Sequence, residues 1–258
     1  MAVNIYGIDG SIKGSMELPG VFSAPLRPEV IRRAVISEES YKLQPQAHSV
    51  LAGMQTSARY YGRMHSYRSG RHMGMAIRPR EKLGGGVQGK VRRIPSATKG
   101  RRAHPHMVEK IIIEKINRKE YQIALASAIA ATASGKSGTA APLVVSNAIE
   151  AVKKTKEMMQ IFDRLKLSER IAQSHKPRLG GSRRSVRRHF KSALLLVAGK
   201  ECDAIKAARN IPGVDACTVS GITVGKLAPG GNPGRQTLWS EDAARSVEKS
   251  IAKIYPHE

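Results

Sequence analysis

Cysteine and long apolar runs are both scarce in this 258-residue chain. The only two cysteines, Cys202 and Cys217, form no CxxC pair, which indicates a reduced, cytoplasmic compartment rather than a secreted one. The longest apolar run, 123–133, is alanine-rich and too short to cross a bilayer. The first eleven residues also lack the basic-then-apolar order of a signal peptide. The sequence therefore predicts a cytoplasmic protein without a membrane span.

Acidic residues are the third scarcity, and they are missing from two places in particular. The chain has 44 Lys and Arg against 20 Asp and Glu, a net charge of +24. Residues 42–108 hold 14 basic side chains and one acid, and residues 176–191 hold seven basic side chains and no acid. The other 175 residues are close to balance, with 23 basic and 19 acidic side chains. A nearly neutral body with two basic extensions indicates a polyanionic partner, either nucleic acid or an anionic membrane.

Outside these segments, short apolar runs alternate with helical patterns. A hairpin is expected over 2–18 around Asp9-Gly10, and a helix is expected from Pro28. Apolar runs at 143–146, 193–198, 214–219 and 236–239 are typical of parallel strands. Helices are expected at 108–116, 117–129, 149–165, 202–208 and after Ser240. The alternation predicts an α/β fold: an open, mainly parallel sheet flanked by helices, with one long non-globular basic loop.

The long loop is the segment that fits no periodic element. We expect a single α/β domain over 1–258, with an extended loop at 45–105 inserted in it and a second basic loop at 176–191. Tyrosines and methionines are interleaved with arginine and glycine in the first loop, a mixture that can stack on bases and contact phosphates. The basic residues predicted to bind RNA are Arg59, Arg63, Arg68, Arg71, Arg78, Arg80, Lys82, Lys90, Arg92, Arg93, Lys99, Arg101, Arg102, Lys176, Arg178, Arg183, Arg184, Arg187, Arg188 and Lys191.

Three fragments resemble catalytic or ligand motifs without completing them. The GKSGT run at 135–139 has Ala130 where a phosphate loop needs glycine, and a helical pattern precedes it instead of a strand. His104 and His106 have no neighbouring cysteine or carboxylate cluster to complete a metal site. No nucleophile–base–acid set stands out, so we expect no enzyme activity and no cofactor. A nucleotide-dependent α/β enzyme, or a general nucleic-acid-binding protein with a basic clamp loop, stays open as the alternative.

Several longer stretches resemble one known family. They are VNIYGIDGSIKGSMELPGVFSAPLRPEVIRRAV (3–35), GRHMGMAIRPREKLGGG (70–86), KGRRAHPH (99–106), AARNIPGVDA (207–216) and LAPGGNPGRQTLWSEDA (227–243). Together they are similar to the universal large-subunit ribosomal protein four, in its archaeal and eukaryotic version, and the short C-terminus resembles the archaeal members. The stretch KPRLGGSRRSVRRHFK (176–191) is less lysine-rich than is usual for the family but keeps its charge.

The resemblance implies a structural role in the large ribosomal subunit and no enzymatic one. The long loop would thread into large-subunit ribosomal RNA and reach the nascent-peptide exit tunnel. Its partners would be that RNA, neighbouring large-subunit proteins at the tunnel and the nascent polypeptide, with no membrane. Near the tip of the loop, Met73, Met75 and Ile77 would be the candidates that line the tunnel.

Overall fold

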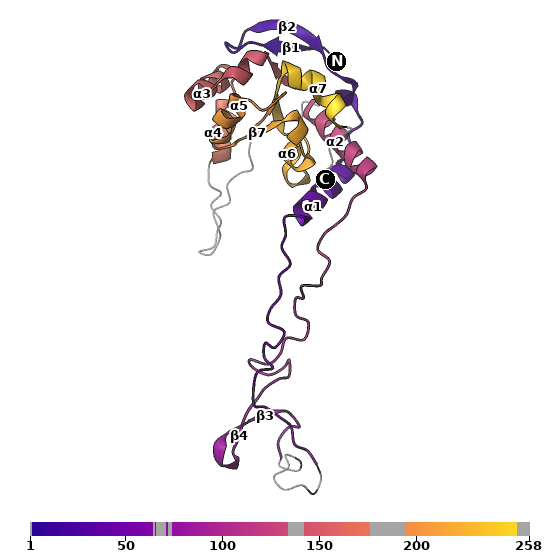
Figure 1. Ribbon diagram of the computed structural model, residues 1–258, viewed down its shortest axis with the longest axis vertical. Helices are drawn as coiled ribbons and strands as arrows, with labels where there is room; N and C mark the ends of the chain where they lie inside the picture. The colour runs from indigo at the N-terminus through magenta and orange to yellow at the C-terminus, as the bar shows by residue number, and fades with distance from the viewer. Residues whose placement is uncertain are drawn as a thin grey trace. The chain divides into compact units, whose positions relative to one another are not determined.

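The computed structural model describes residues 2–63, 65, 71, 74–133, 142–175 and 194–251. They fall into two compact units (Figure 1). The first, which we call the body, is Met1–Lys42 together with Ile113–Glu258. The second, which we call the insert, is Leu43–Ile112 and takes in the whole of the expected 45–105 loop. None of the described helices is long and apolar enough to cross a membrane.

The body is built on a six-stranded sheet with the order β2-β1-β5-β8-β6-β7. The strands are β1 (Ala2–Tyr6), β2 (Ile12–Glu17), β5 (Leu143–Val145), β6 (Leu194–Ala198), β7 (Val214–Thr218) and β8 (Gln236–Ser240). Only the β1–β2 hairpin is antiparallel; every other pair is parallel. Its turn contains Gly10 at φ +80, a conformation that glycine adopts without strain. The apolar runs of β5 and β6 follow from burial on both faces.

One face of the sheet is covered by four helices. They are α1 (Pro28–Ser40), α2 (Arg118–Ala133), α6 (Val224–Leu227) and α7 (Glu241–Ile251). The 3-10 turns Gly20–Ser23, Val219–Gly221 and Pro229–Gly231 lie between strands and helices of this group. From Ser127 to Ala133 the α2 helix has only small or apolar side chains, which explains why this part is buried on every side. Trp239 of β8 packs edge-on against Phe22, with ring centroids 5.4 Å apart. Ser240 caps α7, since its Oγ accepts a hydrogen bond from the Ala243 N–H at 3.2 Å.

The opposite face carries α3 (Thr155–Arg164), α4 (Ser168–His175) and α5 (Asp203–Arg209), preceded by the 3-10 turn Asn147–Ala151. Neighbouring residues of one strand serve opposite faces: Leu195 and Val197 belong to the first core cluster, and Leu196 belongs to the second. The two clusters sandwich the sheet (Figure 1). The predicted fold class, an open and mainly parallel α/β sheet flanked by helices, is therefore confirmed.

Glu38, in the last turn of α1, is a buried acid that joins three elements. Its Oε1 accepts hydrogen bonds from the Tyr121 hydroxyl at 2.7 Å and from the Val224 N–H at 2.8 Å. Its Oε2 accepts one from the Gly225 N–H at 2.9 Å. A Cβ on Gly225 would lie 2.6 Å from that oxygen. The carboxylate therefore ties α1 and α2 to the free N–H groups at the start of α6.

The body also holds together the two ends of the chain that lead into and out of the insert. The Ser37 hydroxyl donates to the Glu114 carbonyl oxygen at 2.7 Å, and the Glu114 N–H donates to Ser40 Oγ at 3.0 Å. The Ser40 hydroxyl in turn donates to the Ser37 carbonyl oxygen at 2.7 Å. This contact, which we call the Ser37–Glu114 latch, closes the body across the insertion by joining two serine hydroxyl groups of α1 to the backbone of Glu114.

Several predicted elements are wrong or incomplete. No helix forms over 108–116: Ile111 is 88% exposed, and of the apolar residues at helical spacing only Ile116 is buried. An amphipathic pattern forms a helix only where a packing partner covers it, and the described residues leave most of 108–116 exposed. The expected helix over 149–165 begins at Thr155, after a 3-10 turn, and α4 was not predicted at all.

The insert contains regular structure that the sequence pattern did not predict. Within the supposedly aperiodic loop, β3 (Arg80–Lys82) pairs with β4 (Gln88–Val91) in an antiparallel hairpin around the 3-10 turn Gly84–Gly86. Arg59 extends this small sheet by a bridge to Arg80. Gly85 has φ +74 in the turn, so the triple glycine closes a hairpin and is more than a flexible spacer.

Candidate nucleic-acid interface

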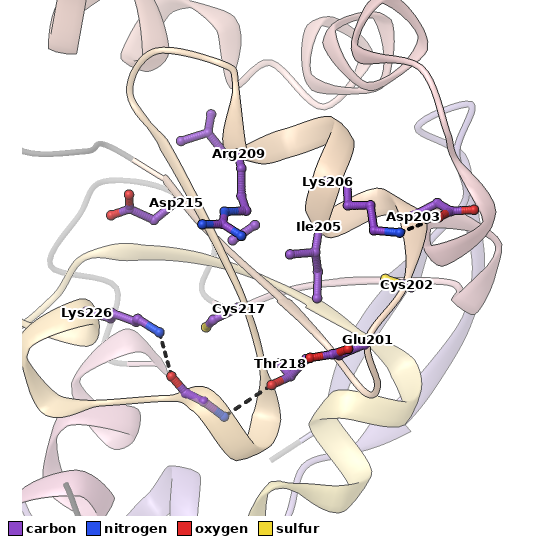
Figure 2. A pocket seen from close by; sticks show the side chains of 13 residues that line it. Glu201, Cys202, Asp203, Ile205, Lys206, Arg209, Asp215, Cys217, Thr218 and Lys226 are labelled. Carbon is purple, nitrogen blue, oxygen red and sulfur yellow. Dashed lines mark hydrogen bonds and ion pairs between the residues drawn. The ribbon is translucent and has the colours of Figure 1, made fainter.

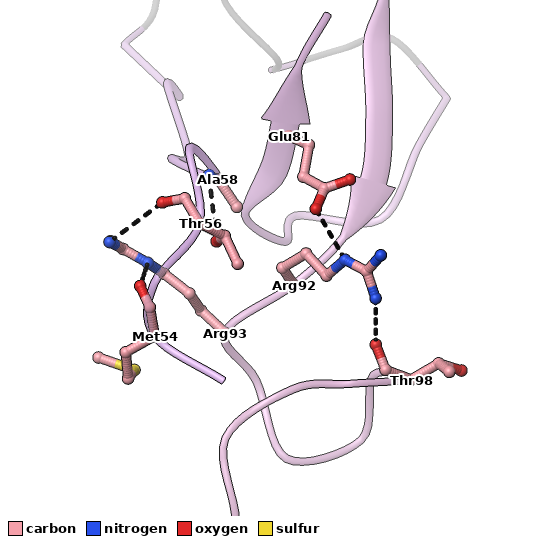
Figure 3. A network of polar contacts seen from close by, with 7 residues as sticks. All are labelled: Met54, Thr56, Ala58, Glu81, Arg92, Arg93 and Thr98. Carbon is pink, nitrogen blue, oxygen red and sulfur yellow. Dashed lines mark hydrogen bonds and ion pairs between the residues drawn. The ribbon is translucent and has the colours of Figure 1, made fainter. Parts of the chain in front are cut away.

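Arg92 joins the hairpin of the insert to the chain that follows it (Figure 3). Its Nε donates to Oε1 of Glu81 at 2.8 Å, and its Nη1 donates to the Thr98 carbonyl oxygen at 2.7 Å. The two side chains of the ion pair are only 16% and 26% exposed, so water screens the pair less than a surface bridge. Glu81 is one of only two acids in the insert. Its role is to hold an arginine inside the unit.

Arg93 makes a second internal contact, to a segment nearly forty residues earlier. Its Nε donates to the Met54 carbonyl oxygen at 3.2 Å and its Nη2 to that of Thr56 at 3.4 Å, as Figure 3 shows. The backbones are also close, because a Cβ on Gly53, at φ +75, would lie 2.5 Å from the Gly100 carbonyl carbon. Two guanidinium groups therefore satisfy backbone carbonyls that lie outside any strand ladder.

The other basic residues of the insert divide by exposure. Arg80 is half-buried, and its Nη2 donates to the Ala76 carbonyl oxygen at 3.4 Å. The remaining predicted contact residues that the structure describes are exposed: Arg59, Arg63, Arg71, Arg78, Lys82, Lys90, Lys99, Arg101 and Arg102. The insert as a whole has 14 basic and two acidic side chains, a net charge of +12. Its scaffold therefore presents a concentration of positive charge to solvent.

An aromatic side chain accompanies this charge. Lys82 Nζ lies 4.2 Å from the centroid of the Tyr61 ring, within the range of a cation–π contact. Hydrogen bonding with Lys82, followed in size by that with Arg59, lowers the pKa of Tyr61 below its ordinary value. Tyr60 and Tyr61 are 38% and 47% exposed. Exposed rings beside cations are the combination that stacks on unpaired bases.

The remaining sequence candidates divide between exposed and undescribed positions. Met75 and Ile77 are 49% and 70% exposed. Arg68, Met73, the GKSGT run and the whole basic segment from Lys176 to Lys191 (Lys176, Arg178, Arg183, Arg184, Arg187, Arg188, Lys191) lie outside the described residues. Among the residues that the structure does describe, no group of three His, Cys, Asp or Glu side chains can hold a metal ion.

The body has a cavity of about 780 Å³ beside α5 and the edge strand β7 (Figure 2). Three of its charged side chains make contacts within the wall: Lys226 Nζ donates to the Gly221 carbonyl oxygen at 2.6 Å, and Lys206 pairs with Asp203 at 3.5 Å. Burial raises the pKa values of the Cys202 and Cys217 thiols, so neither is activated as a nucleophile. Both cysteines pack with the core clusters.

The carboxyl ends of the parallel strands are where a doubly wound sheet would bind a nucleotide. Two backbone N–H groups at this edge donate to side chains of the turn that follows β5. The Gly199 N–H, after β6, donates to Glu150 Oε1 at 2.8 Å, and the Asp242 N–H, at the start of α7, donates to Asn147 Oδ1 at 3.0 Å. A carboxylate in this place repels phosphate. The described part of this edge therefore lacks the features of a nucleotide site, which argues against the alternative of a nucleotide-dependent enzyme.

Comparison with known proteins agrees with the stretches singled out in the sequence. The sequence pattern described as the ribosomal protein L4/L1 family matches residues 16–250, nearly the whole chain. The chain belongs to the ribosomal protein L4/L1 family. It is 42% identical to the large ribosomal subunit protein uL4 of Methanococcus maripaludis, over 96% of this chain and 98% of that one. It is 38% identical to the uL4 of Archaeoglobus fulgidus, over 94% and 96% of the two chains.

These matches confirm the resemblance to the archaeal version of the family. The family consists of structural, non-enzymatic ribosomal proteins, so the enzyme alternative is set aside. For this ribosomal protein, sequence reasoning overlooked the internal contacts of Arg92 and Arg93. Glu81, an isolated acid in the first strand of the hairpin, was a signal for the Arg92 contact, since a lone acid among many cations pairs with one of them. The Arg93 contacts to the Met54 and Thr56 carbonyl oxygens had no such signal.

Proposed function

We propose that this ribosomal protein is a structural constituent of the large subunit that binds large-subunit ribosomal RNA through the insert and through the basic segment 176–191. The relatives in Methanococcus maripaludis and Archaeoglobus fulgidus bear the name of a large-subunit protein. The observation that carries the proposal is the set of exposed cations on the insert, held on a scaffold that Glu81, Arg92 and Arg93 stabilise from within. RNA phosphates supply the charge that the insert lacks.

Contact with the RNA backbone suits this surface better than base reading along a duplex. A-form RNA hides the base edges of its deep major groove, whereas phosphates and unpaired bases stay accessible. Lysine and arginine neutralise the phosphates, and Tyr60 and Tyr61 offer rings for stacking. Recognition would therefore follow the shape of the RNA rather than a continuous base sequence.

The same proposal includes the exit tunnel. The exposed Met75 and Ile77, with Met73, are the apolar side chains that we assign to the tunnel wall near the end of the insert. Their neighbours there would be other large-subunit proteins and the nascent polypeptide. Apolar side chains suit such a wall because they carry no charge that would bind the nascent polypeptide.

Salt dependence of RNA binding tests the proposal. If about ten basic groups contact phosphates, the logarithm of the binding constant falls with the logarithm of salt concentration with a slope of about −7 to −9. Lys90→Ala, at an exposed insert position, should reduce the magnitude of that slope by roughly 0.7–0.9. Lys153→Ala is the matched control, because Lys153 is an exposed lysine of the body. Equal affinity for duplex DNA and for structured ribosomal RNA would instead support the general nucleic-acid-binding alternative.

A further inference from the structure

Two stretches of the insert, 47–54 and 101–109, line a cavity of about 430 Å³. That volume lies within the roughly 300–1,000 Å³ of sites that bind small ligands. Much of its wall is apolar, and the side chains are open to solvent: Val50 is 90% exposed, and Met107 and Val108 are each 57% exposed. A gathered apolar wall of this kind marks a surface that a partner covers.

Two polar side chains of the wall, those of His48 and Glu109, have no hydrogen-bond partner among the described residues. Both ring nitrogens of His48 are shielded from solvent, and no described residue forms a hydrogen bond with either. A buried polar atom without a partner destabilises the free protein, so a ligand that supplies a partner is favoured. Glu109, on the same wall, forms no hydrogen bond or ion pair through its side chain with any residue that the structure describes.

The position of Glu109 is unusual for a surface that binds RNA. It is exposed within a unit of net charge +12, whereas the other acid of the insert, Glu81, is paired with Arg92. A bare carboxylate repels phosphate, but it accepts hydrogen bonds from the amino and imino groups of a base. Arg101 and Arg102 line the same cavity and are exposed, so cations for a phosphate stand beside an acceptor for a base.

We propose that this cavity binds one unpaired nucleotide of the ribosomal RNA, with guanine preferred; the inference rests on the proposed function. The base lies against Val50, Met54 and Met107, and its phosphate binds Arg101 and Arg102. Glu109 accepts from the Watson–Crick edge, where guanine alone among the four bases has an imino and an amino donor side by side. A rotation of the His48 ring turns a nitrogen toward the base. An apolar protein side chain would cover the same wall but would leave His48 and Glu109 without partners.

Photo-crosslinking in assembled large subunits tests this site. A diazirine analogue of methionine, incorporated throughout the full chain, places reactive groups at Met54 and Met107 in the cavity wall and at Met158 in the buried core of the body. We expect Met54 and Met107 to crosslink to the same nucleotide, an unpaired guanine, and Met158 to crosslink only within the protein. Crosslinks from the cavity to a neighbouring protein, or to no RNA at all, would overturn the proposal.

A substitution tests the role of the carboxylate. Glu109→Gln removes the charge and replaces one acceptor with a donor, so the crosslinked guanine should become several-fold more reactive toward a reagent that modifies its Watson–Crick edge. Glu39→Gln, at an exposed position of α1, is the control and should leave that reactivity unchanged. Unchanged reactivity in Glu109→Gln contradicts the assignment of Glu109. Failure of the unsubstituted chain to enter large subunits would refute the proposed function itself. That outcome is distinct from failure of the nucleotide site alone, in which the chain enters subunits but the cavity does not crosslink to RNA.

Discussion

Replacing Glu38 with alanine should destabilise the body more than any surface change. The substitution removes the acceptor of three hydrogen bonds, from the Tyr121 hydroxyl and the Val224 and Gly225 N–H groups. Hydrogen bonds to a charged group contribute about 1.5–3 kcal/mol each, but these share one carboxylate and are not additive. The Val224 N–H also keeps a longer contact with the Tyr121 oxygen, at 3.4 Å. We therefore expect a loss of about 3–5 kcal/mol, a large part of the 5–15 kcal/mol that is typical of a whole domain.

Urea unfolding followed by tryptophan fluorescence measures this loss directly. Trp239 is the only tryptophan, and it is buried in the sheet beside Phe22, so its emission reports the body and not the insert. Glu39→Ala is the matched control, since the neighbouring acid is exposed and its loss should change stability by less than about 0.5 kcal/mol. If the free energy of unfolding of Glu38→Ala lay within about 1 kcal/mol of that of the unsubstituted protein, the stabilising role of Glu38 would be refuted, because the three donors would then have found other partners.

Four further outcomes follow from the same geometry. Burial raises the pKa of Tyr121, so the neutral phenol stabilises the fold fully below pH about 10, and this contribution decreases as the pH rises above about 10. The free energy of unfolding should therefore fall with pH above about 10, and it should fall less steeply in Tyr121→Phe. Because burial raises both thiol pKa values, iodoacetamide at pH 8 should modify native Cys202 slowly and Cys217 only after unfolding. Arg93→Ala should speed proteolysis of the insert in the full chain without RNA, whereas Arg63→Ala, at an exposed position, should not. Gly53→Ala should also speed proteolysis of the insert, since the added Cβ would collide with the backbone at Gly100. Equal cleavage rates of the unsubstituted protein and the three variants would contradict the internal scaffold.

The body was predictable because its signals are local and redundant. Continuous apolar runs predicted β5, β6 and β7 within a residue or two, and Ser240 before two acids predicted the start of α7. The isoleucines around Ile111 show the limit of such patterns, because helical spacing without a covering surface does not produce a helix. Glu38 was not singled out either, since nothing near it in sequence reveals that its three donors lie more than eighty residues away.

The insert was harder to predict because it has little core to constrain it. Among its described residues only Ala58 is a buried apolar side chain, so periodicity carries almost no information about its folding. What orders it instead is the donation of arginine N–H groups to carbonyl oxygens far along the chain, as from Arg93 to Met54. A prediction from composition treats Arg92 and Arg93 like every other basic residue of the insert, although their guanidinium groups already have protein partners.

The difference matters for how an arginine-rich segment binds RNA. A guanidinium group binds a carbonyl oxygen and a phosphate oxygen by the same donors, so each arginine can either shape the protein or contact the ligand, and rarely both. Arg92 and Arg93 donate to backbone carbonyl oxygens within the insert and so hold part of its backbone, which would lower the ordering cost of the proposed RNA binding. In the proposed complex, the exposed cations, among them Lys90 and Lys99, would then contact phosphates from a backbone that is already partly ordered. Substituting an internal arginine should therefore weaken RNA binding through disorder, with a smaller change in salt slope than its charge implies.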